Sequence, residues 1–477
     1  MTASLPETPH RLERMQHLFE AQRQAYEHEP VPEAAQRIDH LRALRASLVR
    51  HQEALIEAID RDYGRRSGDE TRLAEILPTA QGIDYAVKRV RHWMKPSRRR
   101  VGLAFQPGKA RVVYQPLGVV GIIVPWNYPF YLALGPLTAA LAAGNRAMLK
   151  MSEFTPATAE VVARLLDEVF DETQVAVVTG EAEVGKAFSQ LPFDHLLFTG
   201  STAVGRQVMR AAAANLTPVT LELGGKSPAI VSRNVPIEHA AERIAFGKGL
   251  NAGQTCVAPD YVLCPRERVD ELVEALRRQF TSLYPALHDN PDYTWIVNDR
   301  QHGRLKGYLD DALAKGARAI AINPAEEEFD DVRVMPPTLV LDVDDTMRLM
   351  QEEIFGPLLP IVPVDSLEDA MSYVARRPRP LALYYFGYDR AEQRRLMSHT
   401  HAGGMCVNDS VLHVAQEDLP FGGIGASGMG HYHGHEGFLT FSKAKGVFIK
   451  QRLNTARLIY PPYGGRLQRL IYHWFLR

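Results

Sequence analysis

Cysteine is scarce in this sequence, with only Cys256, Cys264 and Cys406 among 477 residues. The three form no CxxC pair and no even-numbered framework, which is typical of a protein kept in a reducing compartment. We therefore expect a cytoplasmic protein. The N-terminus lacks the apolar core of a signal peptide, and no apolar run approaches the roughly twenty residues of a membrane span.

An excess of charge of one sign is also lacking. The 55 lysines and arginines nearly balance the 56 aspartates and glutamates, so the formal net charge is -1. Nothing in this balance indicates a nucleic-acid surface. Hydrophobic residues make up 45% and charged residues 23%, as in a globular protein with a large core, and the length corresponds to roughly three domains.

Predicted strands and helices alternate along most of the chain. In the first series, strands at 118–124, 146–150, 174–178 and 195–198 alternate with helices at 129–143, 156–170, 183–191 and 202–214. A second series follows, with helices at 236–250, 266–280 and 301–314 and strands at 338–341, 359–364, 383–386 and 405–407. This alternation predicts an α/β fold with parallel, doubly wound sheets, which bind ligands at the carboxyl ends of their strands. We interpret the basic run 95–100 as a solvated junction.

One cysteine has the surroundings of a reactive thiol. Cys256 lies in the turn 253–259, which starts with glycine and follows a predicted helix. Cys264 and Cys406 lie in apolar runs and are expected to be buried strand residues. A thiol in such a loop becomes a nucleophile when its pKa is lowered. A free cysteine packed in the core explains the same stretch equally well.

Two further residues have the chemistry that a cysteine nucleophile needs. Asn127, between two prolines, offers an amide N–H donor that would stabilise an oxyanion, although asparagine is also a good helix N-cap. Glu222 lies between two leucines, where burial would raise its pKa toward that of a useful base. A strand whose Glu222 faces solvent is the alternative.

Two strand ends have residues suited to a dinucleotide. Gly200 and Gly205 follow one predicted strand and open a helix, where backbone N–H groups can meet a pyrophosphate. This is not the GxGxxG fingerprint, and glycine is common in such turns. Lys150 and Glu153 follow another strand and could reach ribose hydroxyls, or form a plain surface pair.

Two other motifs have weaker signals. Glu353 and Phe355 precede a fixed turn that an ordinary loop explains as well. His431, His433 and His435 alternate through a glycine-rich loop, but they lack cysteine or carboxylate ligands at familiar zinc spacing. We therefore expect no metal site.

Taken in order, the motifs resemble the aldehyde dehydrogenase superfamily over nearly the whole chain, from about residue 32 to residue 450. The resemblance rests on seven motifs: PWNYP at 125–129, KMSE at 150–153, FTGST at 198–202, LELGGKSP at 221–228, GQTC at 253–256, EEIFGP at 352–357 and LPFGGIGASGMG at 419–430. The compact N-terminal arm resembles the class 3 branch, whose members are commonly dimers. Segments 215–228, 252–263 and 457–465 resemble bacterial coniferyl aldehyde dehydrogenases, which implies coniferaldehyde as the substrate.

The resemblance implies a role for each candidate residue. Cys256 would attack the aldehyde, Asn127 and the Cys256 N–H would hold the oxyanion, and Glu222 would activate water for thioester hydrolysis. The implied cofactor residues are Gly200, Ser201 and Gly205 at the pyrophosphate, Trp126, Lys150 and Glu153 around the AMP half, and Glu353 and Phe355 at the nicotinamide. Glu153 would repel a 2′-phosphate and favours NAD, although class 3 enzymes often accept NADP.

The family's arrangement also implies a division of the chain. We expect an NAD-binding domain at 1–94 and 119–220 and a catalytic domain at 221–404. An oligomerisation arm would comprise 95–118 and 405–450, followed by a tail at 451–477. Exposed arm strands could pair across a homodimer.

Several alternatives stay open. One is a membrane-associated fatty aldehyde dehydrogenase with tail residues 466–477 as an interfacial helix, although a helix packed on the protein's own surface is favoured. A coenzyme A-acylating enzyme, a cysteine hydrolase and a non-catalytic binding protein are the others. Candidates to line an aromatic substrate pocket are Tyr128, Tyr131, His413 and Phe421.

Overall fold

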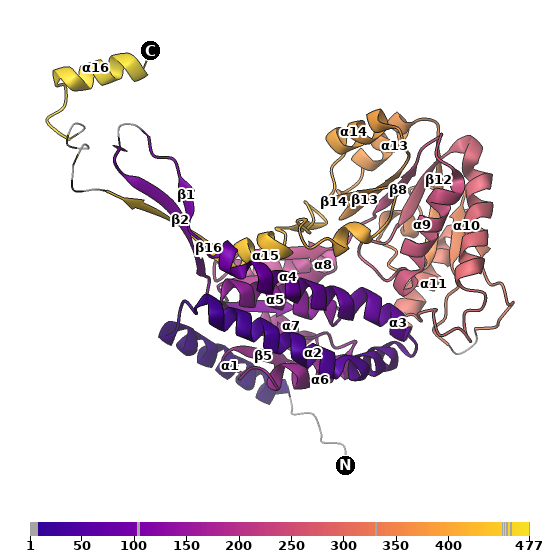
Figure 1. Cartoon of the computed structure of the whole chain (residues 1–477). Helices are drawn as coiled ribbons and strands as arrows, with labels where there is room; N and C mark the ends of the chain where they lie inside the picture. Colours follow the sequence, from indigo (N-terminus) through magenta and orange to yellow (C-terminus); the bar gives the residue numbers. More distant parts are fainter. Residues whose placement is uncertain are drawn as a thin grey trace.

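Two helix-covered sheets and a narrow projecting arm make up the molecule, as Figure 1 shows. The computed structural model describes residues 8–102, 105–329, 332–450, 452, 454, 457 and 460–476. The two large sheets are mainly parallel and the arm is a small antiparallel sheet. This arrangement confirms the predicted fold class.

The first large sheet has the strand order β15-β7-β6-β3-β4-β5. Its parallel strands are β3 (Val119–Ile123), β4 (Arg146–Lys150), β5 (Val175–Val178), β6 (His195–Gly200) and β7 (Val219–Leu223). They are short, mostly apolar runs buried on both faces, as parallel strands between helix layers must be. The two-residue β15 (Gly428–Met429) joins β7 from far along the chain and runs antiparallel to it.

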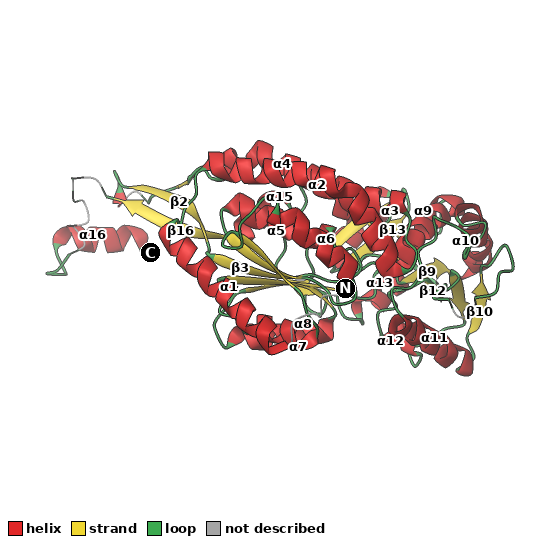
Figure 2. Cartoon of the chain, turned by 90° about the horizontal axis from the view of Figure 1, so that it is seen from below, coloured by secondary structure: helices red, strands yellow, loops and turns green. Residues whose placement is uncertain are grey.

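Helices cover both faces of this sheet, as Figure 2 shows. One face packs against α2 (Ala34–Tyr63), α4 (Leu77–Trp93), α5 (Tyr131–Ala143) and α6 (Pro156–Asp167). The other face packs against α1 (Thr8–His28), α7 (Ala182–Phe188) and α8 (Thr202–Ala213). Between α2 and α4 the chain forms a short helix, α3 (Gly68–Thr71), and a π-helical turn at Arg72–Ile76. The helical segment between α2 and the arm is therefore irregular before Pro78, at the π-helical turn.

The second large sheet has the order β10-β11-β12-β9-β8-β13-β14. Its strands are β8 (Pro228–Val231), β9 (Tyr261–Pro265), β10 (Arg318–Ala321), β11 (Thr338–Leu341), β12 (Leu358–Val364), β13 (Ala382–Phe386) and β14 (Gly404–Val407), and only the β10–β11 pairing is antiparallel. Helices α9 (Ile237–Gly249) and α10 (Val269–Leu283) pack on one face. Helices α11 (Asp299–Ala314), α12 (Arg348–Gln351), α13 (Leu367–Ala375) and α14 (Arg390–His399) belong to the core of the other face.

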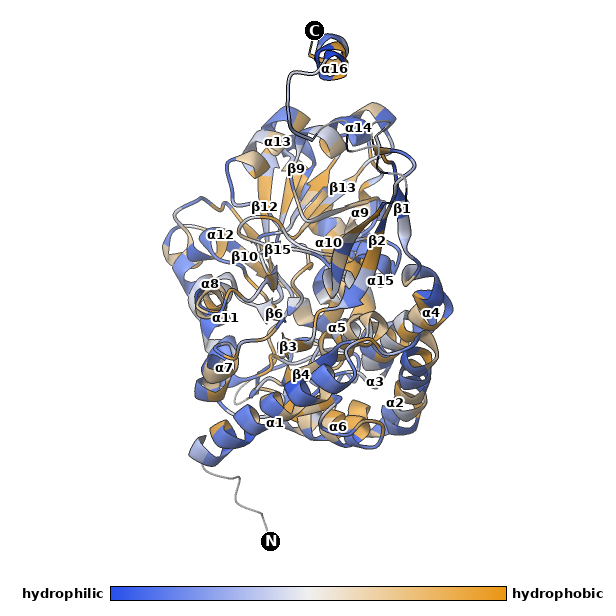
Figure 3. Ribbon diagram, turned by 90° about the vertical axis from the view of Figure 1, so that its left-hand side faces the viewer, coloured by the Kyte–Doolittle hydropathy of each residue, from blue (hydrophilic) through white to orange (hydrophobic). Residues whose placement is uncertain are grey.

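The arm is a sheet of β1 (Ser97–Arg99), β2 (Lys109–Pro116) and β16 (Ser442–Ile449). The basic run 95–100, which we interpreted as a solvated junction, in part forms β1, although its basic side chains are exposed. Helix α16 (Arg466–Phe475) follows the arm and lies apart from the body in Figures 1 and 3. The favoured interpretation, a tail helix packed on the protein's own surface, is therefore wrong for this structure, because Trp474 and Phe475 are each 76% exposed.

The predicted elements of the first series are all present within a few residues of the expected bounds. Cys264 is fully buried in β9 as expected, whereas Cys406 lies in β14 but is only partly buried. The domain limits stay a prediction, because the sheets do not by themselves mark where one domain ends. Among the described residues, no helix is long and apolar enough to cross a membrane.

A glycine pair tests how closely α8 packs on the sheet. A Cβ at Gly205 would lie 2.6 Å from Cδ2 of Leu223 in β7, whereas a Cβ at Gly303 in α11 would meet nothing within 4 Å. Alanine favours a helix over glycine by about 0.5–1 kcal/mol. We expect Gly303→Ala to raise the melting temperature of the cofactor-free protein and Gly205→Ala to lower it by thermal denaturation. An equal rise in both variants would contradict the close packing.

Candidate active site

The site lies where the strand order of the first sheet reverses. After β3 the chain builds β4 and β5 on one side, and β6 and β7 on the other. Ligands bind at such a switch point, beyond the carboxyl ends of the strands. Trp126 and Asn127 follow β3, and Gly200 ends β6. Several sequence-predicted residues therefore share one edge of the sheet.

The loop after β3 is held by its backbone carbonyls. The Asn127 carbonyl accepts hydrogen bonds from the Tyr63 hydroxyl at 2.9 Å, Arg66 Nη1 at 3.2 Å and Asn251 Nδ2 at 3.0 Å. The Asn127 side chain is buried but forms no hydrogen bond with any residue that the structure describes. Its amide is thus available to another group. Helix α5 begins after Phe130, so Asn127 is not its N-cap.

The Cys256 loop has an unusual backbone. Asn251, Ala252 and Gly253 have positive φ angles of 52°, 50° and 73°. A Cβ at Gly253 would lie 2.3 Å from the Gly356 carbonyl oxygen, so only glycine fits there. The buried Gln254 side chain donates to the Asn251 and Trp295 carbonyls and accepts from the Val297 N–H, each at 3.0 Å.

The Asn127 and Cys256 loops are joined directly. Tyr128 follows Asn127, and Thr255 precedes Cys256. The hydroxyl groups of Tyr128 and Thr255 lie 2.7 Å apart and form a hydrogen bond. The Asn251 amide adds its bond from the cysteine loop to the Asn127 carbonyl. The structure therefore brings the predicted oxyanion donor and the predicted nucleophile to one place.

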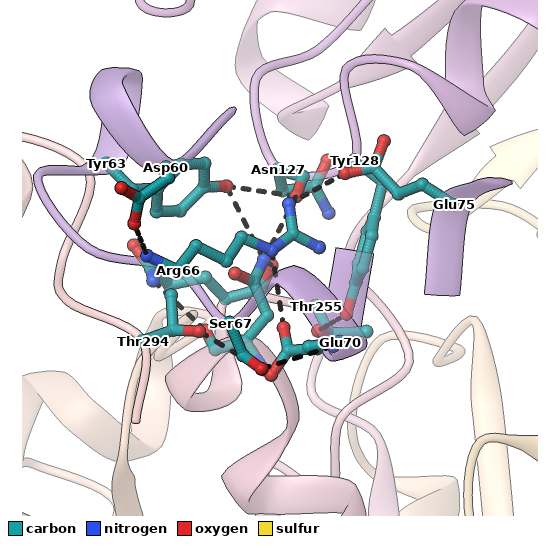
Figure 4. A network of polar contacts seen from close by, with 12 residues as sticks. Asp60, Tyr63, Arg66, Ser67, Glu70, Glu75, Asn127, Tyr128, Thr255 and Thr294 are labelled. Carbon is teal, nitrogen blue, oxygen red and sulfur yellow. Dashed lines mark hydrogen bonds and ion pairs between the residues drawn. The ribbon is translucent and has the colours of Figure 1, made fainter. Parts of the chain in front are cut away.

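A buried ionic network supports both loops (Figure 4). Arg66 has no exposed side-chain surface, and its guanidinium lies 2.7 Å from Glu75 and 3.3 Å from Glu70. Glu75 also accepts the Phe130 and Tyr131 N–H groups of the asparagine loop, at 2.8 and 3.0 Å. Glu70 accepts the Asn251 N–H of the cysteine loop at 3.1 Å. One arginine therefore links two carboxylates, and each carboxylate holds one of the two loops.

Glu222 is buried in β7 without a partner. Both of its carboxylate oxygens are shielded from solvent, and neither accepts a hydrogen bond within the described part of the chain. Burial raises the pKa of Glu222 well above its usual value. The alternative of a solvent-facing Glu222 is therefore wrong. A buried polar group without a partner is rare and indicates a missing ligand, water or catalytic task.

The pKa of the Cys256 thiol is raised as well. Burial, and then the negative charges of Glu353 and Glu222, raise its pKa to about 12. These charges act on the thiol only because both carboxylates are near it. Cys256 therefore needs a base or a nearby positive charge before it can attack.

Glu353 and Phe355 lie in the same region of the structure as Gly224 and Trp126. A Cβ at Gly224 would lie 2.0 Å from a Glu353 carboxylate oxygen, so the carboxylate sits directly over the Gly224 backbone. Burial and the charge of Asp260 raise the Glu353 pKa to about 8. The Phe355 ring packs edge-on against Trp126, with centroids 5.2 Å apart.

The residues predicted to hold a dinucleotide line the ends of β4 and β6. Ser201 is the N-cap of α8 and accepts the Val204 N–H at 3.4 Å. Lys150 is buried, which lowers its pKa, and its ammonium lies 3.6 Å from Glu153. The buried Thr199 hydroxyl at the end of β6 has no partner among the described residues. The N-terminus of α8, the polar pair Lys150 and Glu153, and the Thr199 hydroxyl together fit a dinucleotide cofactor.

An aromatic wall adjoins the cysteine. The Tyr131 hydroxyl lies 3.3 Å from His433 Nε2, and the Phe421 ring stacks on His433 at 5.2 Å. Phe421 and Cys256 are both partly buried and pack against the same hydrophobic cluster. Three buried imidazole nitrogens and one hydroxyl on this wall lack partners in the described chain: His413 Nδ1 and Nε2, His433 Nδ1 and the Tyr432 hydroxyl.

The three alternating histidines do not converge. His433 is buried against Phe421, whereas His435 stacks on Trp93 with centroids 5.9 Å apart. The described residues contain no group of three or more histidine, cysteine, aspartate or glutamate side chains that could hold a metal ion.

The sequence analysis missed the residues that support the site. Arg66, Glu70 and Glu75 look like ordinary surface charges of a helix, and only their burial reveals them. Asn251 and Gln254 stood next to the cysteine motif, where an amide beside a glycine turn was the one available signal.

Comparison with known proteins shows the family to which the chain belongs. The model of the family described as "Aldehyde dehydrogenase family" matches residues 10–447. A probable coniferyl aldehyde dehydrogenase of Pseudomonas aeruginosa is 63% identical, with 100% of this chain and 99% of that protein covered. A coniferyl aldehyde dehydrogenase of a Pseudomonas species (strain HR199) is 48% identical, with 91% of each covered.

Solved structures of related proteins superpose on nearly the whole of this chain. A Staphylococcus aureus AldH in a substrate-bound state superposes with a TM-score of 0.91, at 38% identity, covering 96% of this chain and 99% of that one. A betaine aldehyde dehydrogenase from the same species, in complex with NAD+, has a TM-score of 0.84 at 26% identity, covering 95% and 90%. The resemblance predicted from seven motifs is confirmed.

The ionic network predicts a specific cost for losing Arg66. Arg66→Met leaves two buried carboxylates without their cation, which costs about 3–5 kcal/mol of unfolding free energy. Urea denaturation measures this loss. The control is Arg72→Met, whose exposed pair with Glu53 should leave the unfolding free energy nearly unchanged. Equal effects would show that the buried network does not support the fold.

The raised thiol pKa predicts the pH dependence of alkylation. Because the pKa of Cys256 is about 12, its thiolate fraction should rise about tenfold per pH unit between about pH 7 and 10, without a plateau. Mass spectrometry of the Cys256 peptide after timed iodoacetamide treatment of the cofactor-free protein measures this rate. A plateau near pH 8 would contradict the desolvated thiol.

Proposed function

Because the chain belongs to the aldehyde dehydrogenase family, we propose that it oxidises coniferaldehyde to ferulate with NAD. The observation that carries the chemistry is the buried, unpartnered Glu222 carboxylate close to the Cys256 thiol. Because burial raises its pKa, Glu222 in its carboxylate form is a stronger base than an ordinary glutamate, so it can take a proton from the thiol and from water.

In the first half of the reaction, Glu222 accepts the proton of the Cys256 thiol and the sulfur attacks the aldehyde carbon. Asn127 Nδ2 and the Cys256 N–H donate to the carbonyl oxygen as it becomes an oxyanion. The oxyanion collapses and expels the aldehyde hydrogen as hydride, which leaves an acyl thioester on Cys256. A nicotinamide held by Glu353 and Phe355 would supply the chemistry that this step requires, because it would accept the hydride.

Before the second half, Glu222 releases the thiol proton to solvent, which is the one proton lost per turnover. Glu222 then removes a proton from water and the resulting hydroxide attacks the thioester. The carbon–sulfur bond breaks, the carboxylic acid leaves, and Glu222 returns its proton to the Cys256 thiolate. Per turnover, one aldehyde, one water and one oxidised cofactor give one acid, one reduced cofactor and one proton. A coenzyme A-acylating route would not require a water-activating base at position 222.

The cofactor residues fit the proposed chemistry. Gly200, Ser201 and Gly205 would hold the pyrophosphate, and Trp126, Lys150 and Glu153 the AMP half. Glu353 and Phe355 would position the nicotinamide ribose and ring. The family uses NAD or NADP, and Glu153 favours NAD because its carboxylate would repel a 2′-phosphate.

The substrate assignment rests on two supports. The relatives named above include coniferyl aldehyde dehydrogenases. The wall of Tyr131, Phe421, Tyr432 and His433 combines aromatic rings with unmet hydrogen-bonding atoms. That combination suits an aromatic aldehyde with a phenolic hydroxyl, whose oxygen would satisfy those atoms.

The arm is the proposed dimer contact. Strand β16 lies at one edge of the arm sheet and offers unpaired backbone groups to a second copy. Three free cysteines suit a cytoplasmic site of action.

Two variants test the chemistry. Cys256→Ala should abolish NADH formation, followed by absorbance. Glu222→Gln should slow turnover by about 10²–10⁴ and leave a thioester on Cys256 that intact-mass measurement detects. Glu274→Gln, an exposed glutamate in α10, is the matched control. Turnover in Cys256→Ala would remove the cysteine from the mechanism.

A substrate panel tests the assignment. Wild-type protein with NAD should show a higher kcat/KM for coniferaldehyde than for benzaldehyde or a long-chain alkanal, and lower values with NADP. A preference for the alkanal would overturn the substrate while leaving the chemistry intact.

A further inference from the structure

The buried Glu222 carboxyl has a proton to pass on and no direct contact with solvent. Both of its oxygens are shielded, and neither bonds to a residue that the structure describes. In the proposed function, on which this inference rests, Glu222 must release the thiol proton before it can activate water. The site still holds the acyl group at that stage. A chain of hydroxyl groups, imidazoles or waters would carry the proton out through the protein instead.

The hydroxyl of Tyr432 is within electrostatic reach of Glu222 and of a second carboxyl, Glu417. Tyr432 follows β15, whose Gly428 pairs with Glu222. Its side chain is buried, and its hydroxyl has no partner among the described residues. Burial raises the pKa of this hydroxyl well above its usual value, and negative charge on Glu222 or Glu417 raises it further. The hydroxyl therefore stays protonated and is placed to exchange protons with groups near it.

Tyr131 and His433 continue from Tyr432. A Cβ at Gly135 in α5 would lie 3.7 Å from the Tyr432 ring and 4.0 Å from the Tyr131 ring, so both rings lie against one point of the helix. The Tyr131 hydroxyl is 3.3 Å from His433 Nε2, and the Tyr432 and His433 rings pack edge-to-face at 4.6 Å. Burial lowers the pKa of His433 to about 4, so its ring is neutral and can accept at one nitrogen while it donates from the other.

Glu417 shares a small cavity with Tyr131 and His433. The cavity has a volume of about 30 Å³ and lies between these residues and helices α4 and α5. A water needs about 10–15 Å³, so there is room for one or two. A Cβ at Gly82 in α4 would lie 2.8 Å from a Glu417 carboxylate oxygen, which places that oxygen at the cavity wall.

Glu417 also has the properties of a group that exchanges protons with solvent. The residue is partly exposed, so it meets both the cavity and the outside of the protein. Burial raises the pKa of its carboxyl to about 7. A carboxyl with this pKa gains and loses a proton readily near neutral pH.

We propose that Glu417 is the outer end of a proton route that starts at Glu222 and passes through Tyr432, Tyr131 and the cavity. The Glu222 proton moves to the Tyr432 oxygen while the Tyr432 proton moves on. Tyr131, hydrogen-bonded to His433, passes a proton through cavity water to Glu417, which releases it. One proton reaches solvent, no electron is transferred, and Glu222 is restored as a carboxylate.

This route is compatible with the aromatic wall of the proposed substrate site. A hydroxyl has one proton and two lone pairs, so Tyr432 can accept from Glu222 while it donates to a further oxygen. Glu417 acts only through Glu222 and is therefore a positioning residue in this reaction.

Burst kinetics of the full-length protein test the route. Protein is mixed with NAD and an aldehyde, and NADH absorbance is followed by stopped flow. Hydride transfer precedes proton release, so Glu417→Gln should form about one NADH per site at the wild-type rate and then turn over at least about tenfold more slowly. Glu417→Asp keeps a carboxyl and should restore much of the steady rate. Added imidazole buffer should also speed Glu417→Gln, because a small base can take the proton in place of the lost carboxyl.

Tyr432→Phe removes the first hydroxyl of the route and provides a second test that does not depend on the folding of Glu417→Gln. It should show the same slow steady rate with coniferaldehyde and with benzaldehyde, which has no phenolic hydroxyl. An effect confined to coniferaldehyde would mean that this hydroxyl only binds substrate, and would overturn the route.

Glu274→Gln, at an exposed glutamate of α10, is the matched control and should leave both phases unchanged. An unchanged steady rate in Glu417→Gln overturns the route, as does an equal loss in Glu417→Gln and Glu417→Asp. Loss of the burst itself in Glu417→Gln would show a distorted pocket and also overturns it. If the wild-type protein forms no NADH from any aldehyde, the proposed function fails and the route fails with it.

Discussion

A single buried cation links the asparagine and cysteine loops of this molecule. Arg66 binds Glu75, which holds the backbone of the asparagine loop, and Glu70, which holds the backbone of the cysteine loop. Buried ion pairs add little net stability, because desolvation offsets their attraction. Their value here is geometric: all partners have defined directions, so the two loops cannot shift independently. The site is therefore positioned by the segment 66–75, which supplies none of the residues predicted to act on the aldehyde.

Desolvation governs the chemistry in the same region. Glu222, Glu353 and Cys256 are each pushed toward their neutral forms, mainly by burial. A site of neutral acids is easier to keep folded than one of clustered anions, since like charges a few ångströms apart repel strongly. Glu222 must therefore lose its own proton before it can act as the proposed base.

The fold class and the candidate site residues could be predicted from the sequence, whereas the contacts that support the site could not. Runs such as Val119–Ile123 and Arg146–Lys150 are short, mostly apolar and bounded by turns, so they were recognisable as parallel strands. Asn127, Glu222 and Cys256 were found as motifs, and their roles in catalysis stay predictions. The pairing of Tyr128 with Thr255 and the burial of Arg66 arise from contacts between distant segments, which no local pattern encodes. The exposure of α16 was likewise unpredictable, because an amphipathic helix has the same sequence whether its apolar side is covered or free.

The order of synthesis gives the two-residue strand β15 a consequence of its own. Its Gly428 pairs with Glu222, so the first sheet is completed by residues made more than two hundred positions after β7. During translation, β7 is an open sheet edge while the whole second α/β body is made. Nascent chains with open edges are prone to mispairing. The strand with the proposed base therefore stays exposed to such errors until the chain is nearly complete, when β15 can close its edge.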